Sequence, residues 1–126
     1  RFGRTLRHIH AVYRVTPTGY ITLLGGIKMV RHIVMWNLKP EAAGHTKAEN
    51  AQLMKEKLEG LLGKVEGMLS AQVTTNFTPG GIDVCLVSTH TDKAALDIYQ
   101  NHPAHLEVKK FVHEVIESRV CHDAEI

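Results

Sequence analysis

The sequence predicts an α+β fold in which one antiparallel sheet of four strands is covered by helices on one side. Hydrophobic residues alternate with period two over residues 30–38, as expected for a strand. After Thr46 they recur at helical spacing, and Pro103 separates two later helical segments. From Met29 the predicted order is strand, helix, strand, strand, helix pair, strand. This is the βαββαβ order of a ferredoxin-like unit.

Composition limits the classes of protein that fit this chain. A length of 126 residues with 44% hydrophobic residues is typical of one ordinary domain. No apolar run approaches the roughly 18 residues needed to span a membrane, so we expect no membrane partner. The two cysteines, Cys85 and Cys121, match no metal or redox spacing. We therefore expect them to be buried and reduced, in a cytoplasmic protein.

Charge divides the chain into two parts. Residues 1–28 contain five basic and no acidic residues, whereas residues 29–126 contain ten basic and 13 acidic residues. The larger part is thus mildly acidic and has no basic stripe, so nucleic acid is not an expected partner.

Residues 1–28 are predicted to be an N-terminal extension, followed by a domain over residues 29–126. Met29 directly follows Gly25-Gly26-Ile27-Lys28 and resembles a natural start. The extension has three candidate origins: an upstream start, a remnant of an expression vector, or an Arg-rich organelle address. The first two are favoured because alternation on either side of Thr16-Pro17-Thr18-Gly19 indicates a hairpin and not an amphipathic helix.

The first strand of the domain is apolar on both faces. Period two places His32, Val34 and Trp36 on one face, and Ile33 and Met35 on the other. We expect helices to cover one face and a further layer, such as a partner subunit, to cover the second.

The middle of the chain carries local signals for one helix and two strands. Thr46-Lys47-Ala48-Glu49 matches a capping box, so a helix is expected to begin there. Gly63 is the expected C-terminal cap of that helix. Strands are predicted over residues 68–77 and 83–90, separated by the turn sequence Thr78-Pro79-Gly80-Gly81.

A helix-to-helix corner is predicted around Pro103. Asp92 is the expected N-cap of a short helix that must stop near His102, because a proline follows. Pro103 then occupies the first turn of a new helix, in which His105 shares an inward face with the valines at 108, 112 and 115. A fourth strand is expected over residues 118–122.

Three segments resemble the stress-responsive α/β-barrel (Dabb) proteins. They are Val-Arg-His-Ile-Val-Met-Trp-Asn-Leu-Lys from residue 30, Tyr-x-x-His-Pro-Ala-His-x-x-Val from residue 99, and Ser-Arg-Val-x-x-Asp from residue 118. The resemblance covers residues 29–126 and none of the extension. It implies a homodimer in which two four-stranded sheets face each other as a closed barrel, with Ile33 and Met35 in the dimer interface.

The resemblance also implies a site. In related polyketide cyclases of the olivetolic acid cyclase type, which close a linear chain by aldol condensation without metal or cofactor, a histidine matching His105 is the base. A tyrosine matching Tyr99 supports it, and a histidine matching His32 lies at the pocket wall. All three positions are filled in this sequence. The later part of the third helix departs from those enzymes and carries Lys109, Lys110 and His113.

We therefore predict a pocket with His105 and Tyr99 as catalytic residues and no metal or cofactor. A neutral imidazole can take a proton from the carbon next to a carbonyl, while the tyrosine hydroxyl donates to the developing enolate oxygen. The expected pocket and binding residues are His32, Val34, Trp36 and His102.

Structural roles compete with these assignments. His102 can brace the Pro103 turn, and His105 can donate to a backbone carbonyl inside the core. A zinc site made from His32, His90, His102 and His105 is not expected, because their spacing matches no known zinc motif.

Two functions remain open from the sequence. The first is binding of a small apolar or carbonyl compound, with cyclase-like or lyase-like acid/base catalysis. The second is a non-catalytic, stress-associated structural or binding protein. A cavity of about 300 Å³ or more that both His105 and Tyr99 reach favours the first. A filled core with His105 bonded to the backbone favours the second.

Overall fold

A computed structural model describes residues 4–8, 11–15, 17–19, 21–26 and 28–126. The helices are α1 (Lys47–Glu59), α2 (Lys93–Asn101) and α3 (Pro103–Val115). Within the described ranges, none of the helices has the length and apolar character needed to cross a lipid bilayer. The strands of the main sheet are β4 (Val30–Leu38), β7 (Met68–Thr75), β8 (Val84–His90) and β9 (Ile116–Glu125), and a small hairpin joins β5 (Glu41–Ala42) to β6 (His45–Thr46).

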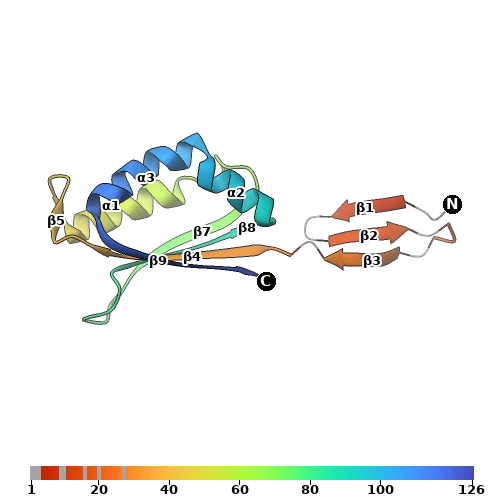
Figure 1. Cartoon of the computed structure of the whole chain (residues 1–126), viewed down its shortest axis with the longest axis horizontal. Coiled ribbons are helices and arrows are strands. Elements are labelled where there is room, and N and C mark those ends of the chain that lie inside the picture. Colours follow the sequence, from red (N-terminus) through yellow and green to blue (C-terminus); the bar gives the residue numbers. More distant parts are fainter. Residues whose placement is uncertain (1–3, 9–10, 16, 20, 27) are drawn as a thin grey trace.

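The main sheet has the strand order β7-β8-β4-β9, and all of its neighbouring strands are antiparallel. Figure 1 shows the three helices on one side of this sheet. The described structure therefore confirms the predicted α+β, ferredoxin-like fold.

Burial along β4 follows the predicted alternation. Val30, His32, Val34, Trp36 and Leu38 are buried beneath the helices, and the residues between them are only half-buried. Residues paired across antiparallel strands project to the same face. The opposite side of the sheet, here called the open face, therefore gathers the apolar residues Ile33, Met35, Cys85, Val87 and Val120.

The capping box of α1 is confirmed, but its predicted C-terminal cap was wrong. The Thr46 hydroxyl accepts from the backbone N–H of Glu49, and the Glu49 carboxylate accepts from that of Thr46. The helix ends at Glu59, and Gly60 caps it by donating to the Glu56 carbonyl. Tight turns follow, in which Leu61 is still buried, so the apolar pattern continues past the end of the helix.

Two predicted strand boundaries also shift. Strand β7 ends at Thr75, before the predicted residue 77, because the Asn76 side chain accepts from the Thr78 backbone N–H and starts a turn. Strand β9 is longer than the predicted 118–122. It follows α3 without a loop and pairs with β4 from Leu38↔Ile116 to Val30↔Glu125. Long-range pairing thus extends a strand that its local sequence marks only at the centre.

Both cysteines lie on strands and are free. Cys85 on β8 was expected to be buried but is only half-buried, because it lies on the open face of the sheet. Cys121 was expected to be buried but is exposed, because β9 forms an edge of the sheet.

Residues 1–28, predicted to be an extension, contain three described strands, β1 (Arg4–His8), β2 (Ala11–Val15) and β3 (Ile21–Gly26). They form a separate antiparallel sheet in the order β1-β2-β3. The expected hairpin corresponds to the pairing of β2 with β3, although Thr16 in its turn lies outside the described residues.

Gly67 allows α2 to approach the start of β7. Its φ angle is +85°, and a β-carbon at this position would lie 2.7 Å from the Ala95 β-carbon on α2. Its carbonyl also accepts a hydrogen bond from the Thr91 backbone N–H at 2.9 Å. Because α2 carries Tyr99, this close approach helps to place a candidate site residue.

We expect Gly67→Ala to lower the free energy of unfolding by about 3 kcal/mol, through backbone strain together with overlap with Ala95. Gly63→Ala is the matched control, since Gly63 also has a positive φ angle, +89°, but has no neighbour within 4 Å of an added β-carbon. It should cost about 1 kcal/mol. Urea unfolding measures both losses, and equal losses would contradict a role for close packing.

Candidate functional site

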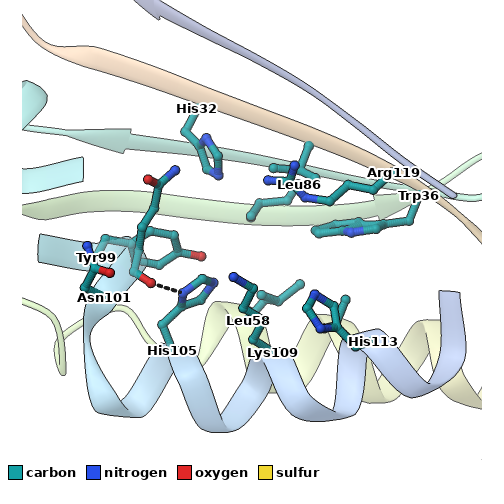
Figure 2. A pocket seen from close by; sticks show the side chains of 13 residues that line it. His32, Trp36, Leu58, Leu86, Tyr99, Asn101, His105, Lys109, His113 and Arg119 are labelled. Carbon is teal, nitrogen blue, oxygen red and sulfur yellow. Dashed lines mark hydrogen bonds between the residues drawn. The ribbon is translucent and has the colours of Figure 1, made fainter. Parts of the chain in front are cut away.

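A cavity of about 440 Å³ lies between the helices and the sheet, and Figure 2 shows the side chains that surround it. It is formed on one side by strands β4, β8 and β9 and on the other by α1, the end of α2 and α3. Its lining residues are His32, Val34, Trp36, Leu58, Leu86, Tyr99, Gln100, Asn101, His105, Lys109, Val112, His113 and Arg119.

The helix corner at Pro103 determines the role of His102. Pro103 occupies the first turn of α3, and the His102 Nδ1 accepts from the Ala104 backbone N–H at 3.0 Å. His102 therefore caps α3 and does not line the cavity, although it was expected among the pocket residues. Its adjacency to the proline explains this, because the residue before the first helical position is where a cap is required.

Tyr99 lines the cavity from α2. Its side chain is 1% exposed, and its ring centroid is 4.3 Å from that of His105. The buried Tyr99 hydroxyl has no hydrogen-bond partner among the described residues. Burial raises the pKa of Tyr99 to about 12, so the hydroxyl keeps its proton and can act as a donor.

His105 is bonded to the backbone and also faces the cavity. Its Nδ1 donates to the Gln100 backbone carbonyl at 3.3 Å, and its ring also lines the cavity (Figure 2). With the proton on Nδ1, the neutral ring carries its lone pair on Nε2. Burial lowers the pKa of His105, the Gln100 bond opposes this, and nearby Lys109 adds to it. The basic form of the imidazole is therefore favoured.

His32 reaches the cavity from the sheet. It is 3% exposed, and its ring centroid lies 6.0 Å from that of Tyr99. Its Nδ1 is hydrogen-bonded to the carboxylate of Asp123, the residue that faces it on β9. The carboxylate fixes the orientation of the ring. Val34 and Trp36 follow His32 on the same face of β4 and also line the cavity.

His90 is a fourth ring in this cluster, and the sequence predicted no role for it there. It is fully buried, its ring centroid is 4.9 Å from that of Tyr99, and its Nε2 lies 3.0 Å from the Ser88 hydroxyl. Burial lowers its pKa to about 4. Its position on the inward face of β8 follows from period two, so the alternation offered a signal for it.

Several polar residues of the cavity were also not placed there by the sequence. Lys109 and His113 follow His105 at i+4 and i+8 on α3, the spacing of one helix face. Arg119 faces Trp36 across the β4–β9 pairing and so projects to the helix side. Gln100 and Asn101 lie at the end of α2. Helical spacing could have indicated the α3 residues, whereas Arg119 required the strand register.

Within the part of the chain that the structure describes, no three or more His, Cys, Asp or Glu side chains converge as a potential metal site. The histidines considered for zinc are separated by their partners: His102 caps a helix, and His90 is bonded to Ser88.

The fold and the cavity together define a ferredoxin-like α+β protein with a histidine- and tyrosine-lined pocket. The model of the stress responsive A/B barrel domain (Dabb) matches residues 30–126, and the chain belongs to this family. No curated protein matches the chain.

Solved structures share the fold. A dimeric protein of unknown function from Bacteroides fragilis is 30% identical, with a TM-score of 0.71, and the match covers 78% of this chain and 96% of that one. A dimeric ferredoxin-like protein from Thermobifida fusca is 16% identical, with a TM-score of 0.67 and coverage of 79% and 92%. The hydroxynitrile lyase from Passiflora edulis is 20% identical, with a TM-score of 0.66 and coverage of 79% and 94%.

The buried His90 predicts an acid-sensitive fold. The unfolded chain takes up a proton on this residue near pH 6.5, whereas the folded protein does so only near its pKa of about 4. The contribution of His90 to the free energy of unfolding is therefore fully present above about pH 6.5. It is lost as the pH falls towards 4, which lowers the free energy of unfolding by about 3 kcal/mol. We expect His90→Gln to reduce this pH-dependent loss.

Urea unfolding at about pH 7 and about pH 4.5 measures the effect. The exposed His45 provides the control substitution His45→Gln, which should retain the full loss. An unchanged loss in His90→Gln would assign the acid sensitivity to other groups.

Proposed function

We propose that this protein is a homodimer whose cavity binds a small, largely apolar carbonyl compound and catalyses proton transfer at the carbon next to the carbonyl, without a cofactor. One observation carries the proposal: the 440 Å³ cavity is lined by both the basic imidazole of His105 and the ring of Tyr99, whose buried hydroxyl has no partner among the described residues. A cavity of this size fits a small ligand.

His105 is the proposed base. Its Nδ1 is held by the Gln100 carbonyl, which leaves Nε2 to accept the proton from the ligand. Burial lowers the pKa of His105, so the neutral form is available near neutral pH. The proton that His105 takes up is returned to the product in the closing step.

Tyr99 is the proposed donor to the enolate oxygen. Burial keeps its hydroxyl protonated, and a preorganised donor in a buried site stabilises charge that develops in the transition state. His32, oriented by Asp123, is placed on the opposite wall to position the carbonyl. The enolate can then attack a second carbonyl, as in a cyclase, and the reverse carbon–carbon cleavage is lyase-like.

The open face supports the proposed homodimer. It gathers Ile33, Met35, Val87 and Val120 on a surface that none of the three described helices covers (Figure 1). A contiguous apolar surface of this kind is typical of an interface. The 30% identical Bacteroides fragilis protein is described as dimeric, which also favours this assembly.

The proposal includes a cytoplasmic location. Cys85 and Cys121 are both free thiols, and free thiols are typical of proteins in reducing compartments. The exposed Cys121 would be open to oxidation elsewhere.

The second candidate is a non-catalytic, stress-associated binding protein. The bond between His105 and the Gln100 carbonyl favours it, because a structural histidine is expected to make such a bond. The two candidates differ in whether His105 moves a proton of the ligand.

Exchange of carbon-bound hydrogen for deuterium tests this difference. Phenylacetone is a suitable probe because it combines one carbonyl with an apolar ring and carries no charge. NMR in deuterated buffer measures the exchange rate at the carbon between the ring and the carbonyl. We expect the protein to accelerate exchange, His105→Ala to lose about 100-fold or more of that acceleration, and Tyr99→Phe about tenfold or more.

The exposed His45 again provides the control, and His45→Ala should exchange the probe at the wild-type rate. Binding of phenylacetone without accelerated exchange would favour the non-catalytic candidate. Equal acceleration by wild type and His105→Ala would remove His105 from the mechanism.

The dimer can be tested separately from catalysis. Met35→Glu puts a charge on the open face and should weaken self-association by about 100-fold or more, since burying an unpaired carboxylate is costly. Analytical ultracentrifugation measures the change. Ile98→Glu is the matched control, because Ile98 is an exposed apolar residue on α2, 54% accessible, away from the sheet. A dimer unaffected by Met35→Glu would place the interface elsewhere.

A further inference from the structure

The cavity is positively charged at one end. Its lining includes Lys109 and Arg119 together with three imidazoles, and none of its lining residues is acidic. Neither the Lys109 ammonium nor the Arg119 guanidinium makes a hydrogen bond or ion pair with another described residue. By contrast, the neighbouring Lys110 is paired with Glu107 at 3.0 Å. Two unpaired cations beside one cavity point to an anionic ligand group.

The two cations come from different layers of the fold. Arg119 is on β9 and projects to the helix side, as Trp36 does opposite it. Lys109 is one turn after His105 on α3. Figure 2 shows the two side chains on opposite walls of the cavity. A small anion between them could contact both.

A third donor lies at the same end. The indole nitrogen of Trp36 is buried and has no partner among the described residues, and the Trp36 side chain is only 4% exposed. A buried donor without a partner is costly in a folded protein. An oxygen-bearing ligand group at this end would satisfy it.

We infer that the ligand is a carboxylate-bearing carbonyl compound, with its carboxylate held between Arg119 and Lys109 and its carbonyl next to Tyr99 and His105. This inference rests on the proposed function and names its substrate class. A planar guanidinium matches a carboxylate with two parallel hydrogen bonds. The apolar side chains of Leu58, Leu86 and Val112 line the same cavity and would contact the body of a small keto acid.

A matched pair of probes tests the inference. Phenylpyruvate and phenylacetone share a ring, a methylene and a carbonyl, and differ in having a carboxylate or a methyl group at the end. Calorimetric titration measures both affinities, and the indole N–H signal of Trp36, the chain's one tryptophan, reports binding at the site by NMR. We expect phenylpyruvate to bind about tenfold or more tightly than phenylacetone.

The cation variants give the decisive comparison. Lys109→Gln and Arg119→Gln should each weaken the binding of phenylpyruvate about tenfold. The affinity for phenylacetone should stay within about twofold of the wild-type value. Lys110→Gln removes the same charge from the adjacent position, which does not line the cavity, and should change neither affinity. The preference for phenylpyruvate should also fall as salt is raised.

The outcomes separate this inference from the proposed function. Equal affinities for the two probes, or a preference that survives in both cation variants, would overturn the inference even if phenylacetone exchange is accelerated. A preference that depends on Arg119 and Lys109 supports it, even if no exchange is catalysed. Failure of both probes to bind would overturn both proposals.

Discussion

The site and the proposed assembly both depend on β4 lying between β8 and β9 in a fixed register. Because successive side chains of a strand project to opposite faces, His32 and Trp36 face the cavity while Ile33 and Met35 face the open side. A shift of one residue in this pairing would exchange the two sets. The residues proposed for ligand binding and for dimerisation are thus fixed by the same backbone hydrogen bonds.

Buried polar atoms without a hydrogen-bond partner lower the stability of the folded protein, and several of them lie around the cavity. Among the described residues, five side chains have a buried polar atom without a partner: Trp36, His90 and Tyr99 lie in or beside the cavity, whereas Arg31 and Asn50 do not line it. A core optimised for stability alone would pair or replace such groups. Three of these five groups gather around one cavity, and unpaired buried polar groups of this kind are expected at a functional site.

Sequence reasoning succeeded where a short-range rule decides the structure. The alternation over β4, the capping box at Thr46 and the corner at Pro103 depend on residues a few positions apart. The predictions were wrong where the bounds of a helix or strand depend on contacts with distant parts of the chain. The length of β9 is set by pairing with β4, and Gly60 replaces Gly63 as the cap because buried turns follow α1.

The same distinction applies to the site. His105 could be placed on an inward helix face from spacing alone, and the resemblance to the family supplied Tyr99 and His32. His102 was predicted to line the pocket, but its ring instead accepts a hydrogen bond from the Ala104 backbone N–H and caps α3. Arg119 could not be placed, because its direction depends on its pairing with Trp36 across 83 positions of sequence.

The cations near His105 and Tyr99 have two opposed effects on the proposed chemistry. Lys109 and Arg119 help to lower the pKa of His105, which makes it a weaker base but keeps it unprotonated. The same positive charges stabilise the negative enolate that forms when the proton leaves, and electrostatic stabilisation of developing charge is usually the larger contribution to catalysis. A ligand carboxylate between them would offset part of their charge and strengthen the base when substrate is bound. In this arrangement, the proposed carboxylate both anchors the ligand and adjusts the proton affinity of His105.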